Sequence, residues 1–163
     1  MATPEPGTSE PGKSEPLLRE ARRADLPQIV ALLADDPIGA GREAPADDGA
    51  YDAAFDLIDA DPRNQLLVAE LDGRVVGTLQ LTMIPGLSRR GMLRGQIEGV
   101  RVAAGQRGHG LGRRMISHAI DVAREHGCGL VQLTSDKRRS DAVRFYQSLG
   151  FADSHEGLKL PLK

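Results

Sequence analysis

The chain has 163 residues, 40% of them hydrophobic, which is long enough for one compact domain and too short for two of ordinary size. Its 21 lysines and arginines nearly balance its 23 aspartates and glutamates, which disfavours nucleic acid as a partner. The single cysteine, Cys128, excludes an internal disulfide and a multi-cysteine metal site.

Neither a membrane segment nor a secretory signal is evident in the sequence. No apolar run approaches the roughly 18 residues that a membrane span requires. The N-terminus is acidic and lacks the basic start and apolar stretch of a signal peptide. We therefore expect a soluble, cytoplasmic protein with no membrane partner. Residues 1–16 are almost wholly Pro, Glu, Gly, Ser, Thr and Lys, which predicts a disordered tail before a single domain over residues 17–163.

Apolar periodicity and turn residues predict ten elements in the order β-α-α-β-β-β-α-β-α-β. Asp25 and Gln28 resemble a capping box, and Asp72-Gly73 is a strong hairpin signal. This order indicates an α/β or α+β fold with a mixed sheet. In chain order the predicted segments are a strand Leu17–Ala21, a helix from Asp25 to Leu33, a loop Asp35–Asp48, a helix Tyr51–Ile58, strands Gln65–Leu71 and Arg74–Met83, a loop Ile84–Gly91, a strand Met92–Val102, a helix Leu111–His126, a strand Leu130–Thr134, a helix capped by Ser140 and ended by Gly150, and further strands from Phe151.

The strand Met92–Val102 changes phase part-way along. After Met92 and as far as Ile97 its apolar residues occupy odd-numbered positions, and from Val100 onward they occupy even-numbered positions. Because strand side chains alternate with a period of two, this change requires one extra residue. We predict a β-bulge at Glu98-Gly99, where the strand should bend.

A glycine-rich turn with several arginines lies between this strand and the next helix. Backbone N–H groups in such a turn converge at the positive end of the helix, which suits a pyrophosphate or a terminal phosphate. A flexible loop with solvated arginines is the alternative. The turn lacks the Lys-Ser/Thr of a Walker A loop, and Arg113 replaces the third glycine of the dinucleotide fingerprint.

Residues 107–112, at the glycine-rich turn, read Arg-Gly-His-Gly-Leu-Gly. They resemble the acetyl-CoA signature Gln/Arg-x-x-Gly-x-Gly/Ala of the GNAT superfamily of N-acetyltransferases. Residues 141–151 are similar to the second signature, in which Ala, an aromatic-Tyr pair and Gly-Phe recur. The signatures cover roughly Ile97 to Phe151, and the first half matches only in its order of elements. Many relatives carry Asn seven residues before the Tyr, where this chain has Arg139.

This resemblance implies a centrally splayed sheet flanked by helices, with acetyl-CoA as co-substrate and no metal. Acetyl-CoA would lie where the strand ending at Val102 parts from Leu130–Thr134, with pantetheine along the backbone and pyrophosphate on the glycine-rich turn. Arg139 could bind phosphate in place of the usual amide. The residues expected to bind the co-substrate are Val100, Arg101, Val102, Arg107, Gly108, His109, Gly110, Leu111, Gly112, Arg113 and Arg139.

Acetyl transfer to an amine requires a base, a stabilised oxyanion and a proton for the departing thiolate. Glu98 is the candidate base because the bulge can aim it into the cleft; an ordinary solvent-facing carboxylate is the alternative. A main-chain N–H near Val100 would meet the oxyanion. Weaker candidates for a catalytic contribution are Asp35, Asp36 and Tyr51.

The resemblance makes Tyr146 the candidate general acid, although its place on an apolar helix stripe also fits a packing role. His109 is interpreted as an exposed loop residue and Cys128 as a small core residue. Neither is expected to carry the chemistry.

The sequence does not identify the acceptor amine. An acidic cluster favours a cationic amine, and a solvated acidic loop explains it equally well; Arg89 and Arg90 instead favour an acceptor with a carboxylate. The resemblance implies direct transfer of acetyl to a primary amine of a small molecule or peptide, and allows a homodimer. A non-catalytic coenzyme A-binding regulatory module and an unrelated nucleotide-binding protein are the alternatives. The acidic cluster comprises Asp35, Asp36, Glu43, Asp47 and Asp48.

Overall fold

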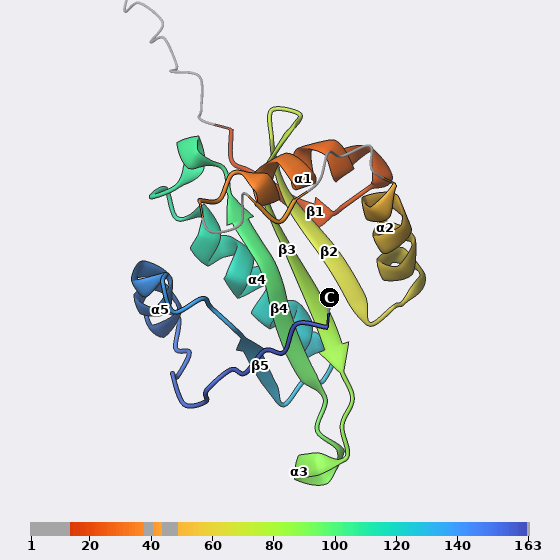
Figure 1. Cartoon of the computed structure of the whole chain (residues 1–163), viewed down its shortest axis with the longest axis vertical. Coiled ribbons are helices and arrows are strands. Elements are labelled where there is room, and N and C mark those ends of the chain that lie inside the picture. The colour runs from red at the N-terminus through yellow and green to blue at the C-terminus, as the bar shows by residue number, and fades with distance from the viewer. Residues whose placement is uncertain (1–13, 38–40, 44–48, 163) are drawn as a thin grey trace, which may run out of the picture.

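The computed structural model describes residues 14–37, 41–43 and 49–162. The predicted tail over residues 1–16 therefore lies almost wholly outside the described residues. In the described part the sheet has five strands in sequential order, the first four antiparallel and the last parallel to its neighbour (Figure 1). This confirms the predicted mixed sheet. The strands are β1 (Leu17–Glu20), β2 (Asn64–Leu71), β3 (Arg74–Ile84), β4 (Arg94–Val102) and β5 (Leu130–Leu133).

Helices cover both faces of the sheet. The long helix α4 packs behind β3 and β4, whereas α1 and α2 lie on the other side, over β2 and β3 (Figure 1). Among the described residues, no helix is long and apolar enough to cross a membrane. The helical segments are η1 (Arg23–Asp25), α1 (Leu26–Ala34), α2 (Ala50–Ala60), α3 (Ser88–Gly91), η2 (Ala104–Gln106), α4 (Leu111–Glu125) and α5 (Ser140–Gln147).

The strands contribute to two cores because their side chains alternate between faces. On β2, Leu67 belongs to the core beneath α4, and the neighbouring Val68 belongs to a smaller core with Ile29 of α1. Along α4, Ile116 and Ala119 are fully buried. The main core therefore fixes the position of α4, and with it the N-terminus of that helix against the end of β4.

Two local predictions about the sheet are confirmed. Asp72 and Gly73 both have positive φ, 49° and 76°, as a type I′ hairpin turn requires. The β3–β4 register shifts opposite residues 98–101, and Gly99 has a φ of 62°. Since a left-handed residue favours glycine, this position can bulge without side-chain strain.

The predicted capping box is wrong, because its two side chains bind elsewhere. The Asp25 carboxylate accepts from the Arg22 backbone N–H at 2.7 Å and from the Arg19 guanidinium. The Gln28 Oε1 accepts from the Val75 N–H at 3.0 Å, which ties α1 to β3. The last predicted helix also differs slightly, since α5 begins at Ser140 and Arg139 occupies its N-cap position.

The strands expected from Phe151 onward are also a wrong prediction. Between Phe151 and residue 162, all within the described part, the structure contains no strand. The Asp-Ser-His-Glu-Gly run at residues 153–157 favours turns, and Pro161 has no N–H for a ladder. In addition, the predicted loop Ile84–Gly91 contains the short helical turn α3.

Candidate active site

Strands β4 and β5 part half-way along β4, which opens a gap in the sheet. Their parallel pairing ends at Ile97 opposite Leu133, and the remaining residues of β4, 98–102, have no partner on β5. On the paired half, Gln132 Nε2 donates to Gln96 Oε1 at 2.7 Å. The predicted central splay of the sheet is thus present at the predicted place.

The backbone of β4 beyond the bulge faces this gap. Arg101 pairs with Thr78 of β3, and the Ala103 N–H donates to the Val76 carbonyl at 2.8 Å. Because hydrogen bonds in an antiparallel ladder alternate from residue to residue, the backbone groups of Val100 and Val102 point away from β3. The Val100 carbonyl accepts from the Arg101 guanidinium at 2.9 Å and the Val102 carbonyl from the Arg107 Nε, so this edge presents to the gap N–H groups that have no strand partner.

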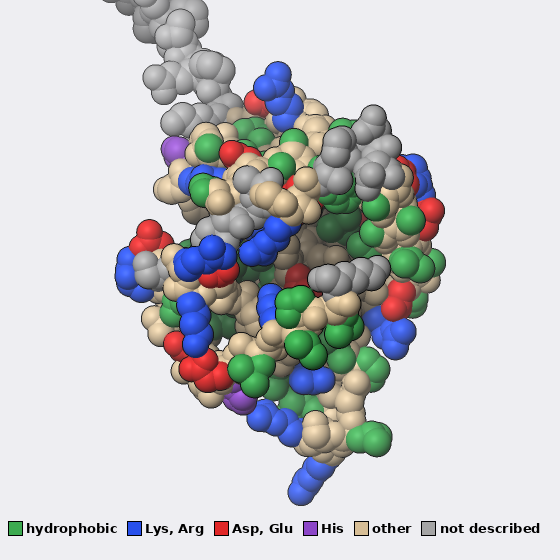
Figure 2. Space-filling view, in the orientation of Figure 1, with side chains coloured by type: hydrophobic (Ala, Val, Ile, Leu, Met, Phe, Trp, Pro, Cys, Tyr) green, Lys and Arg blue, Asp and Glu red, His purple; other side chains and the backbone are tan. Residues whose placement is uncertain are grey.

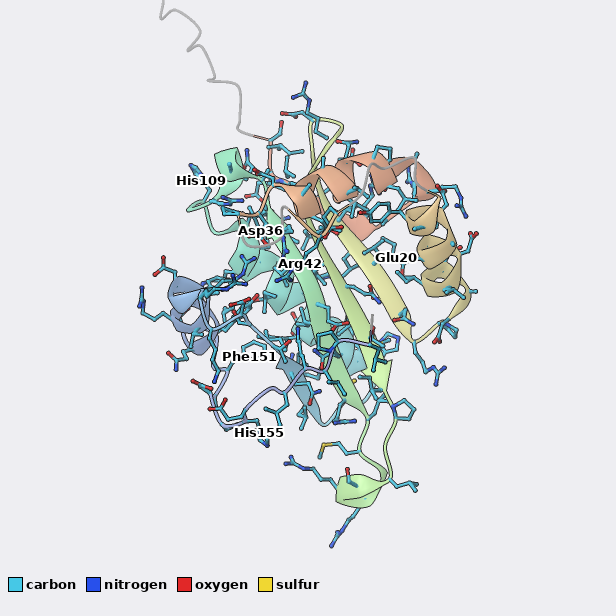
Figure 3. All side chains as sticks on the ribbon, in the orientation of Figure 1. Glu20, Asp36, Arg42, His109, Phe151 and His155 are labelled. Atoms are coloured by element: carbon cyan, nitrogen blue, oxygen red, sulfur yellow. The ribbon has the colours of Figure 1, made fainter. Side chains whose placement is uncertain are left out.

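The glycine-rich turn lies at the end of this edge. Gly108 and Gly110 have left-handed φ values of 78° and 80°, and Gly110 is the N-cap of α4. The first N–H groups of a helix have no intrahelical partner, so they are free to bind an anion. Leu111 is buried and anchors the first turn in the core. His109 is exposed on the turn, as expected (Figure 3).

Three further residues expected to bind the co-substrate surround this turn. The Arg107 Nε donates to the Val102 carbonyl at 3.0 Å, and its guanidinium lies 3.7 Å from the Asp35 carboxylate. On α4, Arg113 donates to the Ser148 hydroxyl at 2.9 Å and so reaches α5. Gly112 faces α5, where an added Cβ would meet the Phe145 ring at 3.5 Å. The structure thus brings β4, the turn and α5 together.

Tyr146 of α5 lies beside the free half of β4. Its ring makes edge contacts with Phe145 and Phe151 at centroid distances of 5.1 and 5.8 Å. Burial raises the pKa of the Tyr146 hydroxyl, and the positive charges of Arg101 and Arg139 partly offset that rise. Both the packing interpretation and the proton-donor interpretation are compatible with this position.

Glu98 is exposed and stands at the bulge. It lies opposite Gln80 in the β3–β4 register, on the sheet face away from Ile97 and α4. Within the described part of the chain its carboxylate makes no ion pair. It is therefore available to a ligand that approaches the open face of the sheet.

A cluster around Asp36, which the sequence did not predict, joins three distant parts of the chain. The Asp36 side chain is only 4% exposed and accepts from Arg101 on β4 at 3.0 Å and from Arg139 at the start of α5. These partners are 65 and 103 positions away, so no local pattern could reveal the pairing. Figure 2 shows a hollow on this face with Lys and Arg side chains grouped along one side.

Two of the five acids of the expected acidic surface, Asp35 and Asp36, form ion pairs with arginines. Glu43 accepts a hydrogen bond from the Tyr51 hydroxyl at 2.8 Å. Asp47 and Asp48 lie outside the described residues. The two arginines of α3, Arg89 and Arg90, are at the tip of the β3–β4 connection, away from the gap (Figure 1).

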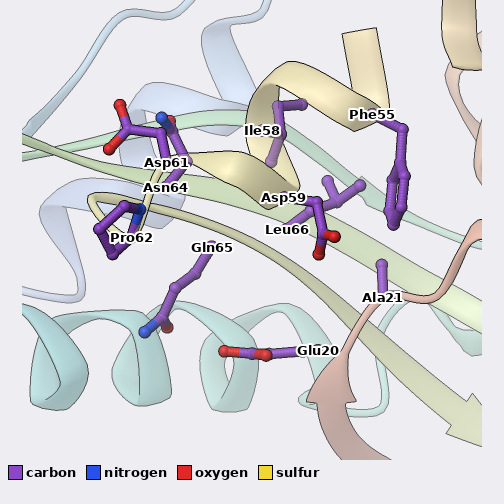
Figure 4. A pocket seen from close by; sticks show the side chains of 10 residues that line it. All are labelled: Glu20, Ala21, Phe55, Ile58, Asp59, Asp61, Pro62, Asn64, Gln65 and Leu66. Atoms are coloured by element: carbon purple, nitrogen blue, oxygen red, sulfur yellow. The ribbon is translucent and has the colours of Figure 1, made fainter. Parts of the chain in front are cut away.

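Cys128 and a separate pocket contribute nothing to this arrangement. Cys128 packs against the main core, and burial raises the pKa of its thiol, which disfavours the nucleophilic thiolate. No cluster of metal-ligating residues occurs within the described ranges. A pocket of about 260 Å³ lies between α2 and β2, two strands from β4 (Figure 4). Its lining includes Phe55, Ile58 and Leu66, and we place the site at the gap because the free backbone edge is there.

Comparisons with known proteins give consistent results. The model of the Acetyltransferase (GNAT) family matches residues 9–151. A glucosamine 6-phosphate N-acetyltransferase of Trypanosoma brucei brucei is 36% identical over 90 residues, 55% of this chain and 59% of that protein. An aminoalkylphosphonate N-acetyltransferase of Salmonella typhimurium is 33% identical over 95 residues, 58% and 61% of the two chains. The match thus spans about three fifths of these curated relatives.

A solved structure extends the likeness over nearly the whole chain. The protein, from Bacillus halodurans C-125 and described as a transcriptional regulator, is 45% identical. It superposes with a TM-score of 0.86, covering 90% of this chain and 99% of the other. The overall fold is therefore shared with a protein of known structure.

Proposed function

Since the chain belongs to the GNAT family of acetyltransferases, we propose that it moves the acetyl group of acetyl-CoA directly to the primary amine of a small, anionic molecule. The observation that carries the proposal is the free backbone edge of β4 beside the N-terminus of α4. A pantetheine amide chain can pair with such an edge, and a pyrophosphate suits such a helix terminus.

Acetyl-CoA, when bound, supplies the acetyl group as an activated thioester. Around the gap, the chain offers the N–H groups of Val100 and Val102 for pairing and the amides of residues 108–113 for phosphate. The residues present therefore fit this co-substrate. The Val100 N–H, which points into the gap, is a donor for a thioester carbonyl oxygen.

The two candidate catalytic residues divide the proton transfers between them. Glu98 faces the open side of the sheet, where an ammonium group can approach, so we assign it the removal of the ammonium proton. Tyr146 lies on the α5 side of the gap, and its raised pKa keeps the hydroxyl protonated at neutral pH. We therefore assign Tyr146 the donation of a proton to the departing sulfur.

Charge near the cleft supports an acceptor that carries an anionic group. Two guanidinium groups, from Arg101 and Arg139, share the single carboxylate of Asp36, which leaves a net positive charge. Two relatives are named for phosphorylated or phosphonylated amines. In this proposal Arg139 serves the acceptor rather than the phosphates of the co-substrate.

A panel of matched amines tests the proposal. Release of free thiol from acetyl-CoA would be followed with glucosamine 6-phosphate against glucosamine, and with aminomethylphosphonate against methylamine. We expect turnover with the phosphorylated or phosphonylated member of at least one pair and a higher KM for its partner without the anionic group. Equal turnover of both members would contradict the anionic acceptor, and titration calorimetry that detects NAD but not acetyl-CoA would contradict the enzyme itself.

A second candidate function is a coenzyme A-binding regulatory module without turnover. It is favoured by the 45% identical structure, which is described as a transcriptional regulator. This alternative predicts acetyl-CoA binding by calorimetry with no thiol release from any amine. The exposed Glu98 and the half-buried Tyr146 beside the gap favour the enzyme.

A further inference from the structure

A row of uncharged polar side chains crosses four strands of the sheet. Asn64 of β2 lies opposite Thr82 of β3. Thr82 in turn lies opposite Gln96 of β4, which lies opposite Gln132 of β5. Residues directly opposite each other on paired strands place their side chains on the same face of the sheet, so the four side chains are neighbours. These four residues, together with Gln80 of β3, are called the polar row below.

The polar row lies on the face of the sheet opposite to α4. Ile97 is buried in the main core beneath α4, and a Cβ on Gly95 would meet the Ala123 methyl at 3.2 Å. Because side chains alternate between the two faces of a strand, Gln96 points to the other side. Glu98 comes two positions later on the same strand and shares that face, about 7 Å further along. The polar row and the candidate base therefore occupy one face.

Hydrogen bonds between its members hold the polar row in place. The Thr82 hydroxyl donates to Asn64 Oδ1 at 2.7 Å, and Gln80 Nε2 donates to the same oxygen at 3.1 Å. Gln132 Nε2 donates to Gln96 Oε1 at 2.7 Å. The side-chain oxygens of Gln80 and Gln132 accept no hydrogen bond from any residue that the structure describes. The C-terminal segment crosses in front of β4, and all five side chains are still partly exposed (Figure 1).

A hydroxyl group is the ligand group that suits the polar row. It both donates and accepts, so it can bind a carboxamide oxygen and a carboxamide N–H without adding charge. An anionic group on this part of the face would meet the free oxygen of Gln80 and the carboxylate of Glu98, which lies opposite Gln80. An alkyl group would cover half-buried carboxamides without replacing the hydrogen bonds that they make to water, which is costly.

We propose that the polar row selects an acceptor that carries hydroxyl groups within a few bonds of its amine. This inference names a substrate class for the acetyl transfer proposed above and rests on that proposal. Along β4, Gln96 precedes Glu98 by two positions and Arg101 follows it by three. An acceptor whose amine meets Glu98 therefore places its hydroxyl groups on the polar row and its anionic group toward Arg101. Gln80 and Gln96 then determine specificity and take no proton in the reaction.

A matched pair of acceptors tests this specificity. 2-Amino-3-hydroxypropyl phosphate and 2-aminopropyl phosphate share the amine and the phosphate and differ in one hydroxyl group. Thiol release should give a kcat/KM about 10-fold higher for the hydroxylated member, as expected when half-buried polar groups lose one hydrogen bond without replacement. Titration calorimetry on the protein saturated with coenzyme A should show the same preference in affinity, and this readout does not depend on turnover.

Substitutions in the polar row test which residues produce the preference. Gln96→Met and Gln80→Met each remove a carboxamide and keep the length of the side chain. Each should reduce the preference for the hydroxylated acceptor toward equality. Gln65→Met is the matched control, because Gln65 is a half-buried glutamine of β2 that shares the α4 side of the sheet with Leu67. The control should keep the wild-type preference, and thermal melting checks that all three variants are folded.

The possible outcomes separate this inference from the proposed acetyl transfer. Turnover of both acceptors with equal kcat/KM and equal affinity would overturn the inference and leave the transfer standing. A preference that persists in both Gln96→Met and Gln80→Met, or that falls equally in Gln65→Met, would also overturn it. Preferential binding of the hydroxylated acceptor without thiol release would overturn the transfer and support recognition of the hydroxyl group. Neither turnover nor binding of either acceptor would overturn both.

Discussion

Tyr146 experiences two opposing influences on its hydroxyl group. Burial against Phe145 and Phe151 disfavours the charged phenolate, whereas the nearby guanidinium groups of Arg101 and Arg139 favour it. Burial is the larger influence, so the pKa lies above the ordinary tyrosine value. The Tyr146 hydroxyl therefore stays protonated at neutral pH and lies near positive charge. Both properties suit a group that donates a proton to a departing thiolate.

Tyr146→Phe should lower kcat by about 10²- to 10⁴-fold, the usual contribution of a positioned acid. The ring contacts persist, so the melting temperature should change little. In the wild type, activity should be lost as pH rises through the raised pKa, above about 10, and the variant should lack that alkaline limb. Thiol-release kinetics across pH measure both effects. An unchanged kcat would leave Tyr146 with a packing role only.

Glu98→Gln tests the base, and its effect should depend on pH. We expect kcat/KM to fall by about 10²-fold at neutral pH, because the glutamine cannot accept the ammonium proton. The loss should shrink as pH approaches the amine pKa near 10, where the neutral amine forms without help. Glu125→Gln, at the exposed end of α4, is the matched control. Parallel pH–rate profiles for Glu98→Gln and the wild type would remove Glu98 as the base.

At the scale of elements, the bulge in β4 links sequence, fold and site. The phase change after Ile97 permits both halves of β4 to contribute to the main core, with Val100 and Val102 packed against it. The extra residue is Gly99, whose left-handed φ bends the strand. The bend accompanies the end of pairing with β5, which leaves the backbone edge free.

Replacing Gly99 with Ala should therefore weaken acetyl-CoA binding in addition to stability. A Cβ at a φ of 62° costs about 1–2 kcal/mol. This strain favours a backbone in which residue 99 leaves the left-handed conformation, which would change the shape of the gap between β4 and β5. Gly73→Ala is a matched control, since Gly73 has a φ of 76° and equally open surroundings in the hairpin turn. Urea unfolding should show similar losses for both variants, and calorimetry should show weaker binding only for Gly99→Ala. Equal affinities of the two variants for acetyl-CoA would show that the bulge does not affect co-substrate binding.

Elements with strong local signals could be predicted from the sequence. The apolar stripe of α4, the Asp72-Gly73 turn and the phase change in β4 each depend on neighbouring residues, and each occurs as predicted. Side chains with distant partners could not be predicted. Gln28 bonds to β3 instead of capping α1, and residues 151–162 form no strand in the described part of the chain.

At the scale of the whole molecule, one carboxylate connects the regions around the cleft. Asp36 follows α1, Arg101 is on β4, and Arg139 begins α5. The glycine-rich turn and the Tyr-bearing helix were predictable because their motifs are contiguous. The charge on the acceptor side was not predictable, because it depends on which acidic residues and arginines form ion pairs in the folded chain. Asp36, expected as part of an acidic surface, is instead buried between two arginines.

Asp36→Asn should destabilise the whole fold, because it leaves two partly buried guanidinium groups to share a neutral amide. Removing one partner of a buried ion pair costs about 3–5 kcal/mol, and the partial exposure of both arginines places the expected loss near the lower limit. Asp136→Asn breaks the more exposed pair with Arg138 and is the control, with a much smaller expected effect. Urea unfolding measures both variants. If Asp36→Asn cost no more than Asp136→Asn, the cluster would be a surface ion pair and would not hold α1, β4 and α5 together.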